Sequence, residues 1–290
     1  MRSEVTIAAC PIRFVIVHYH IFKNAGSTIE SILEREFPGR FASLHGPARE
    51  VVLNGNHLAE FLEENPAVSA LTSHHLCYPK PAIRQTVLFD CCFLRHPLDR
   101  VQSLYSYLRK IESGDPLCQL AHRKSPADFV KCLLDRSPHL ISDVQVHRLA
   151  NGGAFTRPAS EMDLERATRV VLEMAIPGVT DMFDESLVAA EYFLNPAFPG
   201  IRLGYVRQNV SGRLDLDPVE RENELRRLWG ATPYEQLARL NEFDLELYRK
   251  AQKEVGRRLA MVPKFDQRLA EFRSRLRAER AAHGQQRAYA

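Results

Sequence analysis

RFVIVHYHIFKNAGSTIESILEREFPG, residues 13–39, is the stretch that decides the fold. The continuous apolar run at 14–17 predicts a strand over Arg13–His20 that is buried on both faces, as strands of parallel sheets are. After a short loop, apolar residues recur at helical spacing as far as Phe37 and predict a helix that Pro38-Gly39 ends. The order strand, loop and helix is typical of an α/β protein.

A second strand, loop and helix follow later in the chain. Thr86–Leu94 is rich in β-branched and aromatic residues, and the amphipathic helix after it has Pro97 near its first position. Ile176–Val179 and Ile201–Val206 are further candidate strands, and the pattern from Pro218 onward is mostly helical. We therefore expect a P-loop-like parallel sheet flanked by helices, with a helical C-terminal part.

The length and composition fit a globular protein without an obvious linker. Of the 290 residues, 45% are hydrophobic and 26% are charged, which argues against a disordered, collagen-like or membrane-embedded chain. We expect one domain over residues 1–267 and a basic, solvated helical tail over 268–290. The formal net charge of +3 argues against a nucleic-acid coat or a polybasic membrane clamp and leaves room for a local anion site.

The first residues and the cysteines bear on the compartment. The apolar run at 14–17 is too short for a signal-peptide core, and no stretch approaches the length of a membrane span. Six cysteines in 290 residues are too few for a disulfide scaffold, and the adjacent Cys91 and Cys92 lie in an apolar run. We expect a cytoplasmic protein with reduced cysteines, and without a CxxC pair the sequence gives no reason to expect zinc.

The loop after the first strand carries residues suited to a phosphate or sulfate group. A helix start offers unpaired N–H groups and the positive end of the helix dipole, and small residues let an anion approach the backbone. An alternative stays open, because Ser27 and Glu30 also fit a capping box that needs no ligand. The loop lacks the GxxxxGKS/T spacing of nucleoside-triphosphate enzymes. The candidate binding residues are Lys23, Asn24, Ala25, Gly26, Ser27 and Thr28.

A second candidate site lies at the end of the second strand. Arg95 follows Thr86–Leu94 directly, and Ser103 comes about two helical turns later. Ligands of open α/β sheets gather at the carboxyl ends of the strands, where an Arg can bind a phosphate in a fork and a Ser hydroxyl can donate to it. The alternative is that Arg95 forms a salt bridge with a nearby acid and that Ser103 is a small packing residue.

Together, the two segments resemble the cofactor motifs of a known enzyme family. HIFKNAGST and FLRHPLDRVQSLYSYLR are similar to the two motifs of sulfotransferases that use 3′-phosphoadenosine 5′-phosphosulfate (PAPS), most closely the carbohydrate 2-O-sulfotransferases of the uronyl and heparan sulfate type. The resemblance implies that the loop with Lys23 binds the 5′-phosphosulfate and that Arg95 and Ser103 bind the 3′-phosphate, without an obligatory metal. Phe22 stands where the family usually has Pro.

Weaker similarities to the same family follow in the second half of the chain. One is to a GVTE…SL segment, and another is to a late helix of the pattern N…D..LY. Val206–Ser211 resembles a loop that covers the cofactor, which implies a binding role for Arg207. The similar residues are Gly178-Val179-Thr180 with Glu185-Ser186-Leu187, and Asn241, Asp244, Leu247 and Tyr248.

A histidine pair lies between the two cofactor segments. Transfer to a hydroxyl needs a base that takes its proton, and histidine is suited to this because its ordinary pKa is about 6.5. The related sulfotransferases carry a catalytic His in a similarly placed His-x-His segment, which puts Ser73 at the first position and His75 at the catalytic one. His74 is the alternative base, and a solvated loop pair without a catalytic role is the structural alternative.

We therefore expect a PAPS-dependent sulfotransferase that acts on a hydroxyl by in-line displacement. Lys23 and the N–H groups of its loop stabilise charge in this scheme, and His75 is the general base. The resemblance favours an oligo- or polysaccharide acceptor, no nucleic-acid partner is expected, and the oligomeric state is open. Three alternatives remain: a small-molecule or nucleotide kinase with Asp90 as a magnesium ligand, a non-catalytic anion- or glycan-binding protein, and a sulfotransferase for a lipid or small metabolite.

Overall fold

The computed structural model describes residues 12–48, 51–152, 155, 157–205 and 217–288. Its centre is a five-stranded sheet in the order β2-β3-β1-β4-β5, in which neighbouring strands run parallel. The predicted fold class, an α/β protein with a parallel sheet flanked by helices, is confirmed. The strands are β1 (Arg13–Tyr19), β2 (Phe41–Ser43), β3 (Ala70–Ser73), β4 (Thr86–Leu94) and β5 (Ile176–Val179).

Burial explains why β1 takes the central position. Its last five residues are all buried, as a strand with a neighbour on each side and a helical layer on each face requires. Ile16 lies in register with Ala70 of β3 and with Phe89 of β4. The strands predicted for β4 and β5 are confirmed with these bounds. Strands β2 and β3 are not evident from the sequence, because three and four residues are too few for a recognisable pattern.

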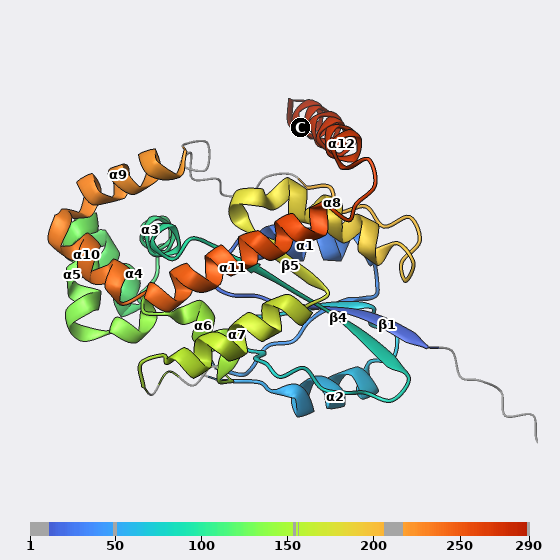
Figure 1. Cartoon of the computed structure of the whole chain (residues 1–290), viewed down its shortest axis with the longest axis horizontal. Coiled ribbons are helices and arrows are strands. Elements are labelled where there is room, and N and C mark those ends of the chain that lie inside the picture. The colour runs from blue at the N-terminus through green and yellow to red at the C-terminus, as the bar shows by residue number, and fades with distance from the viewer. Residues whose placement is uncertain (1–11, 49–50, 153–154, 156, 206–216, 289–290) are drawn as a thin grey trace, which may run out of the picture.

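Helices cover both faces of the sheet (Figure 1). One layer packs around Ile16 and Phe93, and the other packs around Val15 and Val17. Alternate residues of β1 thus enter two different cores, which explains its continuous apolar run. The first layer consists of α1 (Gly26–Glu36), α8 (Phe183–Leu194) and part of α12 (Phe265–Ala288); the second consists of α2 (Gly55–Glu64), α6 (Val144–Ala150), α7 (Glu161–Glu173) and α11 (Glu242–Leu259).

A third apolar cluster is mostly helical and lies beyond the carboxyl ends of the strands, on the left of Figure 1. The fully buried Phe129 and Trp229 belong to it. This cluster fixes α3 beside the end of β4. Its helices are α3 (Pro97–Leu108), α4 (Pro116–Arg123), α5 (Pro126–Arg136), α9 (Pro218–Trp229) and α10 (Ala231–Arg239), and two short 3₁₀ turns, η1 (Pro138–Leu140) and η2 (Thr180–Met182), complete the described elements.

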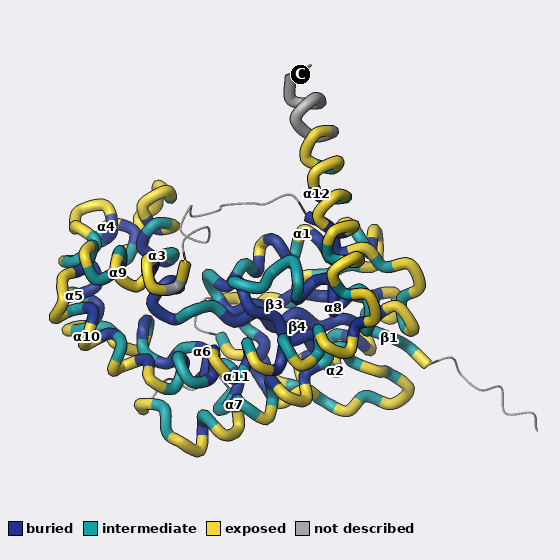
Figure 2. Tube along the Cα trace, turned by 45° about the horizontal axis from the view of Figure 1, so that its top comes forward, coloured by how far each residue is buried: buried dark blue, intermediate teal, exposed yellow. Residues whose placement is uncertain are grey.

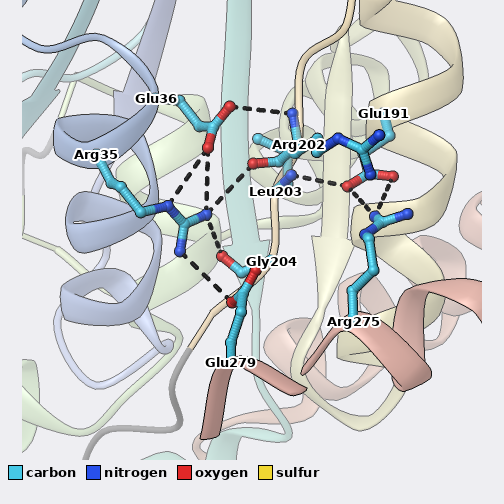
Figure 3. Close-up of polar contacts among 8 residues, drawn as sticks. All are labelled: Arg35, Glu36, Glu191, Arg202, Leu203, Gly204, Arg275 and Glu279. Carbon is cyan, nitrogen blue, oxygen red and sulfur yellow. Dashed lines mark hydrogen bonds and ion pairs between the residues drawn. The ribbon is translucent and has the colours of Figure 1, made fainter. Parts of the chain in front are cut away.

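The strand predicted over Ile201–Val206 is wrong for residues 201–205, the part that the structure describes. Leu203 and Tyr205 are buried, as the alternation in the sequence indicates. The backbone groups of residues 202–204, however, bond to side chains of α1 and α8 instead of to another strand (Figure 3), so these polar groups are satisfied outside the sheet. The contacts are Arg202 N–H to Glu36 at 3.0 Å, Leu203 N–H to Glu191 at 2.8 Å, and the Arg35 guanidinium to the Gly204 carbonyl at 2.5 Å.

Helix α12 is only partly solvated. It begins at Phe265, and its Phe272 and Leu276 are buried in the layer that contains α8. Arg273 donates to Asp184 of α8 at 3.0 Å. Figure 2 shows that the helix is otherwise largely exposed as far as residue 281, the last whose burial is described, and that it projects from the body of the molecule. The basic segment expected as a solvated tail from residue 268 therefore contributes two side chains to the core.

The described cysteines are free, and the adjacent Cys91 and Cys92 are buried as expected. The others are Cys77, Cys118 and Cys132. Within the part of the chain that the structure describes, no helix combines the length and the apolar composition needed to cross a membrane.

Candidate functional site

The carboxyl edge of the sheet gathers the candidate residues. The loop with Lys23 follows β1, Arg95 follows β4, and His74 and His75 follow β3. These ends meet at one edge because the strands are parallel. The chain leaves β1 for β2 and β3 on one side and later enters β4 and β5 on the other, so the order reverses between β1 and β4. Open α/β sheets bind ligands at such a switch point.

The loop between β1 and α1 has an unusual backbone. Lys23 has φ 71° and Ala25 has φ 62°, both in the left-handed region, whereas Asn24 between them is outside it. Left-handed residues other than glycine cost about 1–2 kcal/mol each and persist where contacts fix them. Asn24 supplies such contacts, because its buried Nδ2 donates to the Phe93 carbonyl at 2.9 Å and to Gln145 Oε1 at 2.7 Å. This alternation of handedness is the pattern that turns successive N–H groups to one side in anion-binding loops.

Helix α1 begins without a side-chain cap. Its N-cap is Ala25, and Ser27 lies exposed inside the first turn, so the alternative interpretation of Ser27 and Glu30 as a capping box is wrong. The Thr28 N–H donates to the Ala25 carbonyl at 3.0 Å, but the described residues offer no acceptor to the N–H groups of Gly26 and Ser27. These two groups lie at the positive end of the helix dipole and are suited to an anion.

The Lys23 ammonium lies over an aromatic pair. Its Nζ is 4.0 Å from the ring centroid of Tyr107 and 5.5 Å from that of Phe22, and the two rings meet edge to face. Phe22, which departs from the Pro of the resembling family, is thus part of this aromatic support. Burial lowers the pKa of Lys23 to about 8, with further lowering by the nearby Arg95 and Lys110. An anion bound at this position would relieve the repulsion among the three cations.

Arg95 and Ser103 approach the same loop from the β4 side. The Arg95 guanidinium donates through Nη1 to the Lys23 carbonyl at 3.2 Å, which ties the two predicted phosphate-binding segments together. Ser103 is half-buried in α3, one turn before Tyr107 and on the same face of the helix, at a distance of about 6 Å along the axis. Because Tyr107 contacts Lys23, this face of α3 lies toward the loop.

Five histidines of the described chain cluster on the β3 side of the loop. Ring centroids are 5.1 Å apart for His18 and His20, 3.7 Å for His20 and His74, and 5.9 Å from His45 to both His74 and His75. Burial, followed by repulsion between neighbouring histidines, lowers the pKa of His18 to about 3 and that of His74 to about 4. The pKa values of His20 and His75 are lowered for the same reasons. At neutral pH the rings of His18, His20 and His74 therefore carry no charge.

The ring of His20 explains the glycine at the start of α1. A Cβ at Gly26 would lie 1.8 Å from His20 Nε2, so a larger residue would displace the ring. His20 is itself buried, and its Nδ1 has no partner among the described residues. The histidine cluster and the helix start are therefore in direct contact.

The two candidate bases contact different neighbours. His75 Nδ1 accepts from the Gly46 N–H at 2.8 Å, so the neutral ring carries its proton on Nε2 and has no free lone pair. His74 lies beside the Lys23 loop instead, with its ring centroid 3.7 Å from that of His20 and 6.2 Å from that of Phe22. A hydrogen bond between one ring nitrogen of His74 and the His20 backbone opposes the lowering of the His74 pKa. The other ring nitrogen has no hydrogen-bond partner among the described residues. His74 therefore offers a lone pair near the loop.

Asp90, the candidate magnesium ligand of a kinase, has a structural role. It is buried in the middle of β4. Its carboxylate accepts from the Tyr78 hydroxyl at 2.7 Å, from Lys80 Nζ at 2.8 Å and from the Ala175 N–H at 3.0 Å. These contacts occupy both oxygens. Across the described residues, no group of three or more His, Cys, Asp or Glu side chains is arranged to hold a metal.

The weaker sequence similarities lie partly inside and partly outside the described residues. The Ser186 hydroxyl donates to the Met182 carbonyl at 2.6 Å and accepts from the Val179 N–H at 3.3 Å, so it holds the turn between β5 and α8. Arg207 and the rest of Val206–Ser211 lie outside the described residues.

Gln145 is a residue of this edge that the sequence analysis misses. It belongs to α6, and its Oε1 accepts hydrogen bonds from Asn24 and from the Arg95 N–H, which are 121 and 50 residues away in the chain. Its only signal in the sequence is a polar residue between Val144 and Val146. Such a signal is too common to select a site residue.

Comparison with known proteins finds a relative that is itself uncharacterized. No family model matches the chain. An uncharacterized protein of Archaeoglobus fulgidus is 27% identical over 247 residues, which cover 82% of this chain and 96% of that protein. The similarity extends over nearly the whole length of the archaeal protein.

Proposed function

We propose that this protein is a PAPS-dependent sulfotransferase that transfers a sulfuryl group to a hydroxyl acceptor. The observation that carries the proposal is the convergence of Lys23, the uncapped start of α1 and Arg95 at one point of the carboxyl edge. Two cationic side chains and two open N–H groups suit a ligand with two anionic ends, such as a nucleotide with a 5′-phosphosulfate and a 3′-phosphate. The resemblance of both segments to PAPS-binding motifs supports the same ligand and a glycan acceptor.

The residues of the loop would stabilise charge during the transfer. PAPS supplies the sulfuryl group when it is bound. The Lys23 ammonium and the N–H groups of Gly26 and Ser27 are suited to the oxygens of the phosphosulfate, where negative charge grows as the bond to the departing nucleotide breaks. Arg95 and Ser103 would hold the 3′-phosphate and so keep the nucleotide in one orientation.

We propose His74 as the general base, in preference to His75. The acceptor hydroxyl would give its proton to the free ring nitrogen of His74 while its oxygen attacks sulfur. His75 would first have to break its 2.8 Å hydrogen bond with the Gly46 N–H. The lowered pKa of His74 keeps it unprotonated at neutral pH, as a base must be.

The test is an acceptor screen with radiolabelled PAPS and purified protein. The acceptors are anionic glycans, neutral glycans, a lipid alcohol and small hydroxyl metabolites. We expect transfer to a glycan, a loss of about 10²–10⁴-fold in His74→Ala, and a much smaller loss in His75→Ala, the matched control. Transfer only to a lipid or metabolite would contradict the glycan acceptor and keep the chemistry. Transfer at the wild-type rate in His74→Ala would refute the role of His74.

Nucleotide binding tests the cofactor independently of the acceptor. Adenosine 3′,5′-bisphosphate should bind far more tightly than AMP, because Arg95 and Ser103 require the 3′-phosphate. Arg95→Ala should cost about 1.5–3 kcal/mol of binding free energy, the usual scale for a charged hydrogen bond. Equal affinities for the two nucleotides in isothermal titration calorimetry would contradict PAPS as the donor.

A non-catalytic nucleotide- or glycan-binding protein is the second candidate. It predicts tight binding of adenosine 3′,5′-bisphosphate without transfer to any acceptor. The unprotonated ring of His74 beside the loop favours the enzyme, because a binding protein needs no unprotonated base there. The three hydrogen bonds that the buried Asp90 carboxylate accepts count against the kinase.

A further inference from the structure

Gln145 bonds to both predicted phosphate-binding segments. It lies in α6 and is fully buried. Its Oε1 accepts from the Asn24 side chain at 2.7 Å and from the Arg95 N–H at 2.9 Å, and its Nε2 donates to the Arg95 carbonyl at 2.9 Å. One amide therefore joins the loop after β1 to the residue that ends β4.

The link closes a ring of contacts. Asn24 also donates to the Phe93 carbonyl of β4 at 2.9 Å, and Arg95 reaches back to the Lys23 carbonyl at 3.2 Å. A shift of the loop relative to the end of β4 would break several of these hydrogen bonds at once. The spacing between the two segments is therefore determined by side chains as well as by the sheet.

A buried network on α11 holds Gln145 in turn. Asp244 accepts from the Gln145 N–H at 3.1 Å, from the Val146 N–H at 2.8 Å and from Gln145 Nε2 at 3.3 Å. The Asp244 N–H donates to Asp143 Oδ1 at 2.8 Å, and Asn241 Oδ1 accepts from the Asp143 N–H at 3.2 Å. The late helix motif with Asn241 and Asp244 thus fixes α6 rather than contacting the loop itself.

Space filling alone does not account for an amide at this position. An unbranched apolar side chain of the same length would occupy a similar volume. The backbone of Arg95, however, presents a donor and an acceptor to one side chain, and among neutral side chains the amides supply a carbonyl and an N–H group in one plane. The remaining bonds of Gln145 go to Asn24 and Asp244 and to no strand of the sheet.

We infer that Gln145 is a positioning residue for nucleotide binding. It holds the segment that would bind the 5′-phosphosulfate and the segment that would bind the 3′-phosphate at one spacing, so that both ends of the nucleotide are engaged together. The inference rests on the proposed function. It gives α6, which has no recognisable motif, a role in the site.

The test measures the affinity of the protein for three nucleotide probes by calorimetry: adenosine 3′,5′-bisphosphate, 5′-AMP and 3′-AMP. The variant is Gln145→Met, which keeps the length of the side chain and removes its hydrogen bonds. The matched control is Arg13→Met, because the Arg13 guanidinium also donates to three backbone carbonyls, those of Leu62, Asn65 and Val68, but at the opposite edge of the sheet. Circular dichroism and melting temperature report folding for each variant.

We expect Gln145→Met to weaken the binding of all three probes about tenfold or more, which corresponds to about 1.4 kcal/mol. Arg13→Met should weaken the binding of none of them. Arg95→Ala should weaken 3′-AMP more than 5′-AMP, because it serves one phosphate. Unchanged affinities in folded Gln145→Met, or a loss confined to one mononucleotide, would overturn the inference. If Gln145→Met does not fold, Gln145→Glu, which keeps the acceptor and loses the donor, must weaken all three probes. Failure of the wild-type protein to bind any probe would instead refute the proposed function.

Discussion

Lys23 makes a proton-linked prediction for nucleotide binding. Burial, Arg95 and Lys110 lower its pKa from 10.5 to about 8. The ammonium fraction is then about 0.9 at pH 7, about 0.5 at pH 8 and about 0.1 at pH 9. An anion at Lys23 favours the charged form and raises the pKa in the complex. Above pH 7, protein molecules whose Lys23 is uncharged must therefore take up a proton at Lys23 when the nucleotide binds.

The expected uptake follows from these fractions. Binding of adenosine 3′,5′-bisphosphate should take up about 0.5 proton per site at pH 8 and about 0.9 at pH 9. The affinity should fall as the pH rises over this range, because the free lysine must first gain a proton. The neighbouring His74, with a pKa of about 4, does not titrate here. The phosphate groups, with a second pKa of about 6, are ionised at pH 8 and 9, whereas at pH 7 each retains about 0.1 proton, and its release on binding offsets the small uptake by Lys23.

Calorimetry in buffers of different ionisation enthalpy measures the uptake at each pH. Lys23→Arg is the control, because the guanidinium stays charged at all three pH values and should bind the nucleotide without proton uptake. An uptake below about 0.1 proton in the wild-type protein at pH 8 and 9 would refute the reasoning. The same uptake in Lys23→Arg would assign the proton to another group.

Three further predictions test separate parts of the structure. The rate of sulfuryl transfer should be level from about pH 5 to 7 and fall only as the pH drops toward about 4, because His74 must be unprotonated; an inflection at about 6.5 would indicate a base with an ordinary histidine pKa. Asp90→Ala should lower the free energy of unfolding in urea by at least about 2 kcal/mol, since the buried Tyr78 hydroxyl and the half-buried Ala175 N–H lose their acceptor. It should leave nucleotide affinity unchanged; a loss of affinity would contradict the structural role. Ser27→Ala should change that free energy by less than about 0.5 kcal/mol, whereas Ser160→Ala, which removes a capping box, should lower it by about 1 kcal/mol; equal losses would indicate that Ser27 caps α1 after all.

The central elements of the fold are predictable because their signals are local. Strand β1 has a continuous apolar run, and α3 has a long apolar stripe that begins at Pro97. Strands β2 and β3 have three and four residues, and no periodicity can be read from so few. The alternation at 201–205 does predict burial, but the side chains that replace a strand partner come from α1 and α8, more than ten residues away in the sequence.

At the start of α1, a prediction from local capping motifs is wrong. Ser27 and Glu30 have the spacing of a capping box, yet the left-handed φ of Ala25 makes Ala25 the N-cap and moves Ser27 into the helix. That φ depends on the bonds of Asn24 to Phe93 and Gln145, which the local sequence does not contain. The failure leaves the N–H groups of Gly26 and Ser27 open, and it therefore coincides with the candidate site.

The choice between His74 and His75 also lies beyond the sequence. Adjacent residues of an extended segment point to opposite sides, so one of the pair must turn away from the loop, but the side depends on the register of β3 against β1. The hydrogen bond from the Gly46 N–H to His75 comes from the chain after β2, a strand that the sequence does not reveal. The position of the pair between the two predicted phosphate-binding segments is evident from the sequence, and the chemistry of each ring is not.

The strand order bears on how the two halves of the candidate site face each other. Arg95 and Ser103 lie on the β4 side of the Lys23 loop, and His74 follows β3 on the other side. In-line displacement requires the attacking oxygen and the departing group on opposite sides of the transferred atom. Under the proposed function, a nucleotide held from the β4 side with its phosphosulfate at Lys23 leaves the β3 side to the acceptor. The placement of β1 between β3 and β4 would then separate the donor from the base, and the charge-stabilising loop would lie between them.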